Sequence, residues 1–143
     1  YLQSGRLWMP ALDVLAGFAC LCLASAIASG LSDERSDRAG GKHTVVTMLG
    51  NPAARSLMIA SVVVGGVTWL GTAWLSRGTP TPVLLGAAGL ALSRVAALVE
   101  LSRPSITDAF TAQHALKTAL HRAVWEPGLV IAGLLAAGPL LGL

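Results

Sequence analysis

The sequence predicts an all-α, polytopic integral membrane protein with four transmembrane helices and one short amphipathic interfacial helix. Hydrophobic residues make up 54% of the 143 residues, only 12% are charged, and the mean hydropathy is +0.68. The apolar residues gather in four blocks, each long enough to cross the roughly 30 Å hydrocarbon core of a bilayer as a helix. Since lipid offers the backbone no hydrogen-bond partner, each block is expected to be helical. We expect one bundle over residues 1–143, with spans at about 8–31, 57–75, 82–101 and 125–143 and the interfacial helix at about 105–121.

The first span, 8–31, is expected to stay in the mature chain. A secretory signal has an apolar core of only about 7 to 15 residues, whereas this block is longer and begins with Pro10 and Asp13. The chain starts at Tyr1 rather than Met, as expected of either a processed end or a piece of a longer protein.

Small residues recur at close spacing in the later spans. Ser61, Gly65 and Gly66 lie in the second span, and Gly89 and Ser93 lie in the third. Small side chains let helix backbones approach where no hydrophobic force drives helix association in lipid. We therefore expect these residues to pack helices together rather than to bind a cofactor.

The segment between the third and fourth spans has the pattern of an amphipathic helix. Ser105 and Asp108 follow Pro104 and resemble an N-cap with its acidic partner. Polar side chains, among them His114 and His121, then recur at three- and four-residue steps, with apolar side chains mostly on the other side. We expect this helix to lie along the membrane surface as a connector; the alternative is the rim of a ligand site or partner interface.

The distribution of Lys and Arg predicts the orientation. Loops 32–56 and 102–124 together carry seven of these residues, and the opposite side of the bundle carries two. By the positive-inside rule both loops face the cytoplasm and both chain ends face outward, as in a multi-pass protein of the cell membrane, in bacteria the inner membrane. The net charge is +3, and the basic residues lie between and beside the spans rather than on one soluble face. Nucleic acid is therefore not an expected partner. The four tryptophans are expected in the interfacial belt: Trp8, Trp69, Trp74 and Trp125.

Arg94 is the strongest functional feature of the sequence. It lies twelve residues into the third span, where insertion scales give Arg a cost of about 2.5–3.5 kcal/mol at the helix centre. Its guanidinium must therefore reach the interface or find a partner inside the bundle. Glu100 follows six residues later and projects about 120° away, so the two are not expected to pair. A structural role and a binding role for Arg94 both stay open.

The cysteines and histidines allow several interpretations. Cys20 and Cys22 point in nearly opposite directions on the first span, which suits apolar filling, although thiolates also suit Cu(I). His43, His114 and His121 all lie in the two cytoplasmic loops. His114 and His121 are two helical turns apart, about 10 Å, so one haem iron or metal cannot bind both on a regular helix. The three histidines therefore have three alternative interpretations: surface residues, a quinone or proton site, and a haem or metal site.

No motif of a self-sufficient enzyme is present. The sequence has no phosphate-binding loop, nucleophile elbow, zinc-protease motif, or paired-cysteine motif for zinc or an iron–sulfur cluster. We therefore expect a membrane subunit with no catalytic residues, metal site or covalent cofactor of its own. Such a bundle can anchor a catalytic partner, exchange a lipid-soluble quinone or conduct an ion.

Short motifs flank the amphipathic segment. In chain order they are Leu101-Ser102-Arg103-Pro104, Ala109-Phe110 and Leu120-His121-Arg122. They resemble the Leu-Gly-Arg-Pro and Leu-Ser-Arg segments of the membrane anchor subunits of dimethyl sulfoxide reductase and the polysulfide-reductase type, with Ser102 in place of Gly and Glu100 where that family usually has His. A second register aligns Leu49-Gly50-Asn51 with the Leu-Ser-Arg segment. The family holds an iron–sulfur subunit and a molybdenum subunit at the membrane and oxidises quinol without a haem, and the resemblance implies the same here.

The stretch Leu120-His121-Arg122-Ala123-Val124-Trp125-Glu126 also resembles the last helix of copper-resistance D-type membrane domains. That resemblance implies a small transporter or channel for copper or another ion, which is the alternative function. Metal analysis of the purified protein and a search for associated iron–sulfur polypeptides distinguish the two hypotheses.

The favoured hypothesis is a membrane subunit that anchors a larger redox complex, takes part in electron transport and interacts with quinone or quinol. Its partners are then the lipid bilayer and the proteins of that complex. The predicted ligand site is the cytoplasmic rim where the third span meets the amphipathic helix, at Arg94, Glu100, Arg103, His114 and His121. Arg and His supply donors for the quinone oxygens, and Glu100 or a His carries the proton that accompanies each electron.

Overall fold

The computed structural model describes residues 9–75, 81–101 and 110–141. Every element of secondary structure in these ranges is a helix, which confirms the predicted all-α class. In chain order the helices are α1 (Met9–Ala39), α2 (Val45–Leu49), α3 (Asn51–Leu75), α4 (Thr81–Ser93), α5 (Val95–Leu101) and α6 (Phe110–Leu141).

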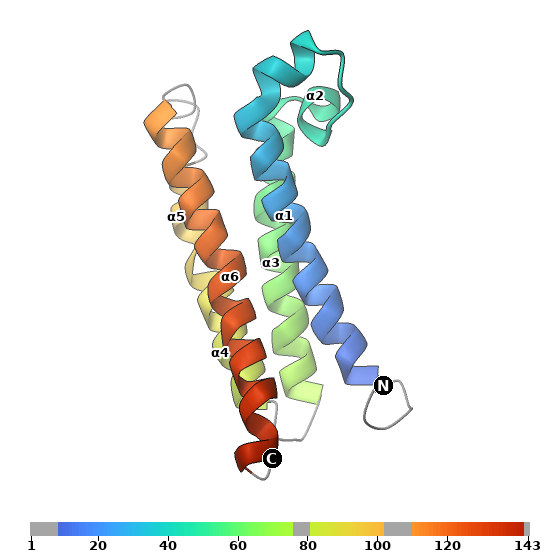
Figure 1. Ribbon diagram of the computed structural model, residues 1–143, viewed down its shortest axis with the longest axis vertical. Helices are drawn as coiled ribbons and strands as arrows, with labels where there is room; N and C mark the ends of the chain where they lie inside the picture. The colour runs from blue at the N-terminus through green and yellow to red at the C-terminus, as the bar shows by residue number, and fades with distance from the viewer. Residues whose placement is uncertain (1–8, 76–80, 102–109, 142–143) are drawn as a thin grey trace.

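The long helices run alternately up and down (Figure 1). α1 and α3 form one antiparallel pair, and α4 with α5 continues as one rod that runs antiparallel to α6. The described chain therefore begins and ends at the same end of the bundle, and α2 lies at the opposite end (Figure 1). This topology agrees with the predicted arrangement, in which loops one and three share one side and the two termini share the other.

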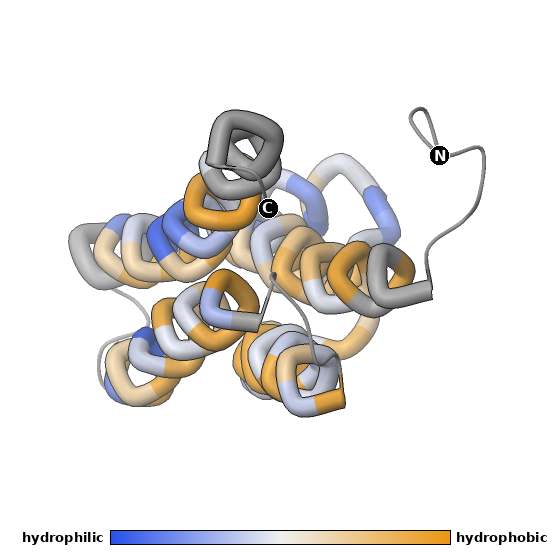
Figure 2. The backbone as a smooth tube through the Cα atoms, turned by 90° about the horizontal axis from the view of Figure 1, so that it is seen from below, coloured by the Kyte–Doolittle hydropathy of each residue, from blue (hydrophilic) through white to orange (hydrophobic). Residues whose placement is uncertain are grey.

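Three stretches are long and apolar enough to cross a membrane: Val14–Ala39, Asn51–Leu75 and Pro82–Leu101. Apolar side chains also cover the outside of the bundle, where Leu15, Val67 and Leu129 are each more than half exposed, and Figure 2 shows hydrophobic residues around the helices rather than on inner faces alone. A surface of this kind suits contact with lipid. The fourth span, 125–143, stays a prediction; its first seventeen residues belong to α6.

The loop between the first two spans is much shorter than predicted. α1 continues to Ala39 and α3 begins at Asn51, so most of the predicted loop 32–56 is helical. Charged residues extend α1 beyond its apolar part because they pair along the helix, as where Arg38 Nε donates to Glu34 Oε1 at 3.0 Å. Hydropathy marks where a helix leaves the lipid, and here the helix continues past that point.

The structure also corrects the prediction of a separate interfacial helix at 105–121. α6 runs without interruption from Phe110 to Leu141 (Figure 1), so the amphipathic segment and the last apolar block form one rod. Arg122, Ala123 and Val124, which join the two segments, include no glycine or proline that would end the helix. The predicted N-cap residues Ser105 and Asp108 lie outside the described residues.

α1 and α3 pack closely through glycines, as the small-residue pattern predicts. A Cβ atom on Gly65 would lie 2.8 Å from the Gly17 carbonyl oxygen, and a Cβ atom on Gly17 would overlap the indole of Trp69. Trp69 is fully buried, and its Nε1 donates to the Val14 carbonyl at 3.0 Å. The predicted interfacial position of Trp69 is therefore wrong, because this close approach gives the indole both an apolar site and an acceptor. Trp74 is 87% exposed, as an interfacial residue should be, and Trp8 lies outside the described residues.

Polar side chains join α1 to α3 and cap the start of α2 near the first loop. Asn51 Nδ2 donates to Glu34 Oε2 at 2.8 Å, and Arg55 Nε donates to Asn51 Oδ1 at 2.6 Å. α2 begins with a capping box in which Thr44 and Thr47 each bond the other's backbone N–H. These bonds fix the turn between α1 and α3 at the end of the bundle that the prediction places in the cytoplasm.

Candidate functional site

The rod formed by α4 and α5 is interrupted at Arg94, between Ser93 and Val95. The Arg94 backbone N–H donates to the Ala91 carbonyl at 3.2 Å, three residues back instead of the usual four. The Leu90 carbonyl, which loses its usual donor, accepts a hydrogen bond from Ser93 Oγ at 2.8 Å. The regular helical hydrogen-bond pattern is therefore broken at Arg94, and the Ser93 hydroxyl supplies a donor to the Leu90 carbonyl.

Arg94 has a partner inside the bundle. Its Nη2 lies 2.7 Å from Glu126 Oε2 on α6, and each side chain is about one third exposed. An Arg within a membrane span must either reach the interface or find a partner, and Glu126 is that partner for Arg94. Glu126 was missed because it lies at the edge of the fourth apolar block, although it is the sole acidic residue between positions 110 and 141.

α6 carries its own irregularity beside this ion pair. Pro127 follows Glu126 and is fully buried. Because proline has no backbone N–H, the Ala123 carbonyl lacks its ordinary helical donor. Two packed helices thus carry backbone irregularities at the level where Arg94 and Glu126 meet, and in membrane bundles such irregular backbone is tolerated where it is buried in protein or lines a cavity.

A groove of about 430 Å³ lies between the α4–α5 rod and α6 beside this pair. Its lining residues are Arg94, Ala97, His114, Ala115, Thr118, Ala119 and Arg122. The alanines provide the space, and two guanidinium groups, an imidazole and a hydroxyl provide the polar groups. The Nε atom of Arg94 is buried and has no hydrogen-bond partner among the described residues. The exposed side chains of His114 and Arg122 therefore present donors to a ligand that carries acceptor oxygens.

The structure brings together part of the predicted site. Arg94 and His114 line the groove, whereas His121 is half-buried and Glu100 is exposed, and neither lines it. Arg103 lies outside the described residues. Arg122 lines the groove although the prediction left it out; it stands eight residues after His114 and four after Thr118, so it shares their face of α6. Spacing from His114 could have identified it.

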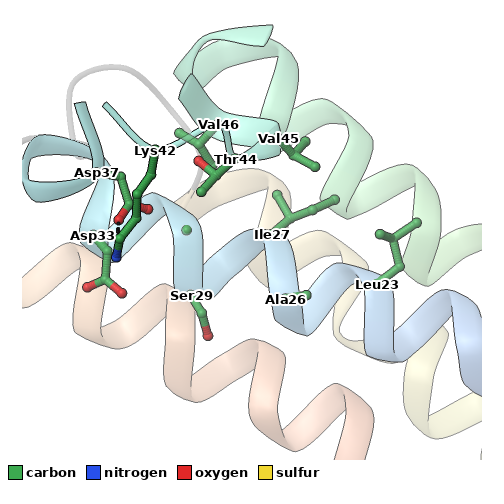
Figure 3. Close-up of a pocket in the computed structure, with 11 residues that line it drawn as sticks. Leu23, Ala26, Ile27, Ser29, Asp33, Asp37, Lys42, Thr44, Val45 and Val46 are labelled. Carbon is green, nitrogen blue, oxygen red and sulfur yellow. Dashed lines mark ion pairs between the residues drawn. The ribbon is translucent and has the colours of Figure 1, made fainter. Parts of the chain in front are cut away.

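A second cavity, of about 290 Å³, lies between α1 and the segment that includes α2. Figure 3 shows Asp33, Asp37 and Lys42 at one end of it and Leu23 at the other. Asp37 is buried, and its Oδ1 lies 3.2 Å from Lys42 Nζ. This pair neutralises the buried Asp37 carboxylate, and the exposed Asp33 leaves the lining with one net negative charge.

The cysteines and possible metal ligands were also located. Cys20 is half-buried and Cys22 is exposed, and both are free thiols. Over the described ranges, no three or more His, Cys, Asp or Glu side chains come together in a way that could hold a metal ion.

Comparison of the chain with protein-family models, curated proteins and solved structures gives no match. The resemblances to reductase anchor subunits and to copper-resistance domains therefore stay predictions that rest on the short motifs alone.

Proposed function

We propose that this chain is an integral membrane subunit of a larger redox complex and binds a quinone or quinol headgroup in the groove between α5 and α6. The observation that carries the proposal is the Arg94 guanidinium, which belongs to a residue that lines the groove. Glu126 bonds the Arg94 Nη2, and the buried Arg94 Nε has no hydrogen-bond partner among the described residues. A quinone needs donors for its carbonyl oxygens and an apolar wall for its ring. Arg94 and His114 supply donors, and the alanines of α5 and α6 supply the wall.

Binding of a quinone analogue to the purified protein tests the site. Arg94→Gln and His114→Ala each remove a donor from the groove, and loss of a hydrogen bond from a charged group costs about 1.5–3 kcal/mol, or about tenfold or more in affinity. His121→Ala is the matched control, because His121 lies on the same helix and does not line the groove. Equal affinity in all three variants, with detergent melting near that of the parent, would place any quinone elsewhere.

Copurification tests the anchoring role. Tagged protein extracted from its native membrane in mild detergent should retain polypeptides that bind iron–sulfur clusters. A chain recovered alone, with stoichiometric copper or another metal in elemental analysis, would support the transporter alternative instead. Cys20→Ala and Cys22→Ala would then show whether the thiols of α1 hold that metal.

Labelling with an impermeant thiol reagent tests the orientation that the Lys and Arg distribution predicts. In a chain whose two native cysteines are replaced by Ala, a cysteine at Ser36 should be protected in intact cells, and a cysteine at Thr79 should be labelled. Ser36 is an exposed residue near the end of α1. The reverse pattern would put the first loop outside and would agree with the reductase anchor family, which places these loops on the outer face.

A further inference from the structure

The predicted fourth span, 125–143, places the groove near the boundary of the hydrocarbon core. α6 has 32 residues, about 48 Å at 1.5 Å per residue, so it is longer than the roughly 30 Å core. Its apolar part begins at Trp125, which is 61% exposed, as tryptophans at the membrane interface commonly are. Arg122 precedes Trp125 by almost one turn, so the predicted fourth span places it at the depth of lipid headgroups.

The lining of the groove carries net positive charge. Arg94 and Arg122 contribute guanidinium groups, His114 contributes an imidazole, and none of the lining residues is acidic. Glu126 bonds one nitrogen of Arg94 and leaves Nε without a partner, and Arg122 is exposed. Guanidinium groups match the oxygens of a phosphate group and form paired hydrogen bonds with it. An anion with several oxygens can therefore accept hydrogen bonds from both guanidinium groups at once.

We propose that this groove holds the phosphate group of an anionic phospholipid, with Arg122 and Arg94 on the phosphate and an acyl chain along Ala97, Ala115 and Ala119. Basic pockets between membrane helices on the cytoplasmic side bind anionic headgroups in this way, and the Lys and Arg distribution predicts that side for this end of the bundle. The inference goes beyond the proposed function: the lipid and the quinone headgroup compete for Arg94, and lipid binding does not require a quinone.

Lipid retention is the direct test. The protein is reconstituted in nanodiscs of phosphatidylcholine with phosphatidylglycerol, without quinone, then released into detergent and analysed by native mass spectrometry. The parent should retain phosphatidylglycerol in preference to phosphatidylcholine. Arg122→Gln should lose about tenfold of that preference, Arg122→Lys should keep part of it, and Arg35→Gln, which removes the same charge from an exposed site on α1, should match the parent.

Three outcomes overturn the inference. Equal retention of both lipids removes the selectivity, and unchanged retention in Arg122→Gln removes the site. Displacement of phosphatidylglycerol by millimolar inorganic phosphate would mean that the groove takes a free anion rather than a lipid. Quinone-analogue binding measured in nanodiscs of phosphatidylcholine alone tests the proposed function separately, so either claim can fail while the other stands.

Discussion

The two halves of the bundle differ in how closely their helices pack against each other. Between α1 and α3, glycines let the backbones meet, and Trp69 is fully buried with its indole N–H bonded to the Val14 carbonyl. Between the α4–α5 rod and α6, the helix is interrupted at Arg94, and small side chains leave a groove of about 430 Å³. Both halves contain small residues at the helix contacts. In the α1–α3 half, glycines let the helices pack in direct contact, whereas in the other half alanines beside long polar side chains leave a groove.

Polar groups follow the same division. In the α1–α3 half, Glu34, Asn51 and Arg55 bind one another near the loop and fix the turn. In the α5–α6 half, Glu126 bonds one nitrogen of Arg94, while Arg122 and His114 line the groove with no carboxylate among the lining residues. This difference suggests that the closed half stabilises the bundle and that the open half binds a ligand. Substitutions in each half test these two roles.

The largest effect is expected in the closed half, from Gly65→Ala. The added Cβ would lie 2.8 Å from the Gly17 carbonyl oxygen, so α1 and α3 must move apart, and overpacking of this kind costs roughly 1–3 kcal/mol. Gly71→Ala is the control on the same helix, since a Cβ there meets no atom within 4 Å and alanine favours the helix by about 1 kcal/mol. Unfolding in detergent and denaturant measures both, and equal stability of the two variants would show that the close contact is not needed.

A smaller effect is expected from loss of the hydrogen bond that Trp69 donates to Val14. Trp69→Phe keeps an aromatic ring in the site and removes the indole N–H, which should cost roughly 1 kcal/mol together with a small cavity term. Trp74→Phe on the same helix, at a site that is 87% exposed, should change stability by no more than about 0.5 kcal/mol. A Trp69 variant as stable as the Trp74 variant would contradict a structural role for the buried indole.

In the open half, the Arg94–Glu126 pair should contribute least to stability. Both side chains are about one third exposed, so solvent screening limits the pair to about 1 kcal/mol or less. A double-mutant cycle with Arg94→Leu, Glu126→Leu and the combined variant isolates that coupling. A coupling energy as large as the cost of Gly65→Ala would mean that this half is also built primarily for stability.

The all-helical class and three helices long enough to cross a membrane were predicted because hydrophobic length alone limits what can cross a membrane. Hydrophobic length did not predict where helices end: residues 32–38 continue α1 through pairs such as Glu34 with Arg38, which hydropathy does not count. The buried position of Trp69 was missed because it depends on Gly17 of another helix. Arg94 was identified from its cost in lipid, and Arg122 could have been identified from its spacing from His114 and Thr118. Glu126 required the register of α6 against the α4–α5 rod, which no local pattern in the sequence specifies.

The central claim is that the open half binds the ligand, and photo-crosslinking tests it most directly. A photoreactive quinone analogue, added to the purified protein in nanodiscs of phosphatidylcholine, should label peptides of α5 and α6 that contain Ala97 or Ala119. Excess unlabelled quinone and the His114→Ala variant should both reduce that labelling, whereas His121→Ala should not. Labelling confined to α1 and α3, or labelling of α6 that excess quinone leaves unchanged, would contradict the account.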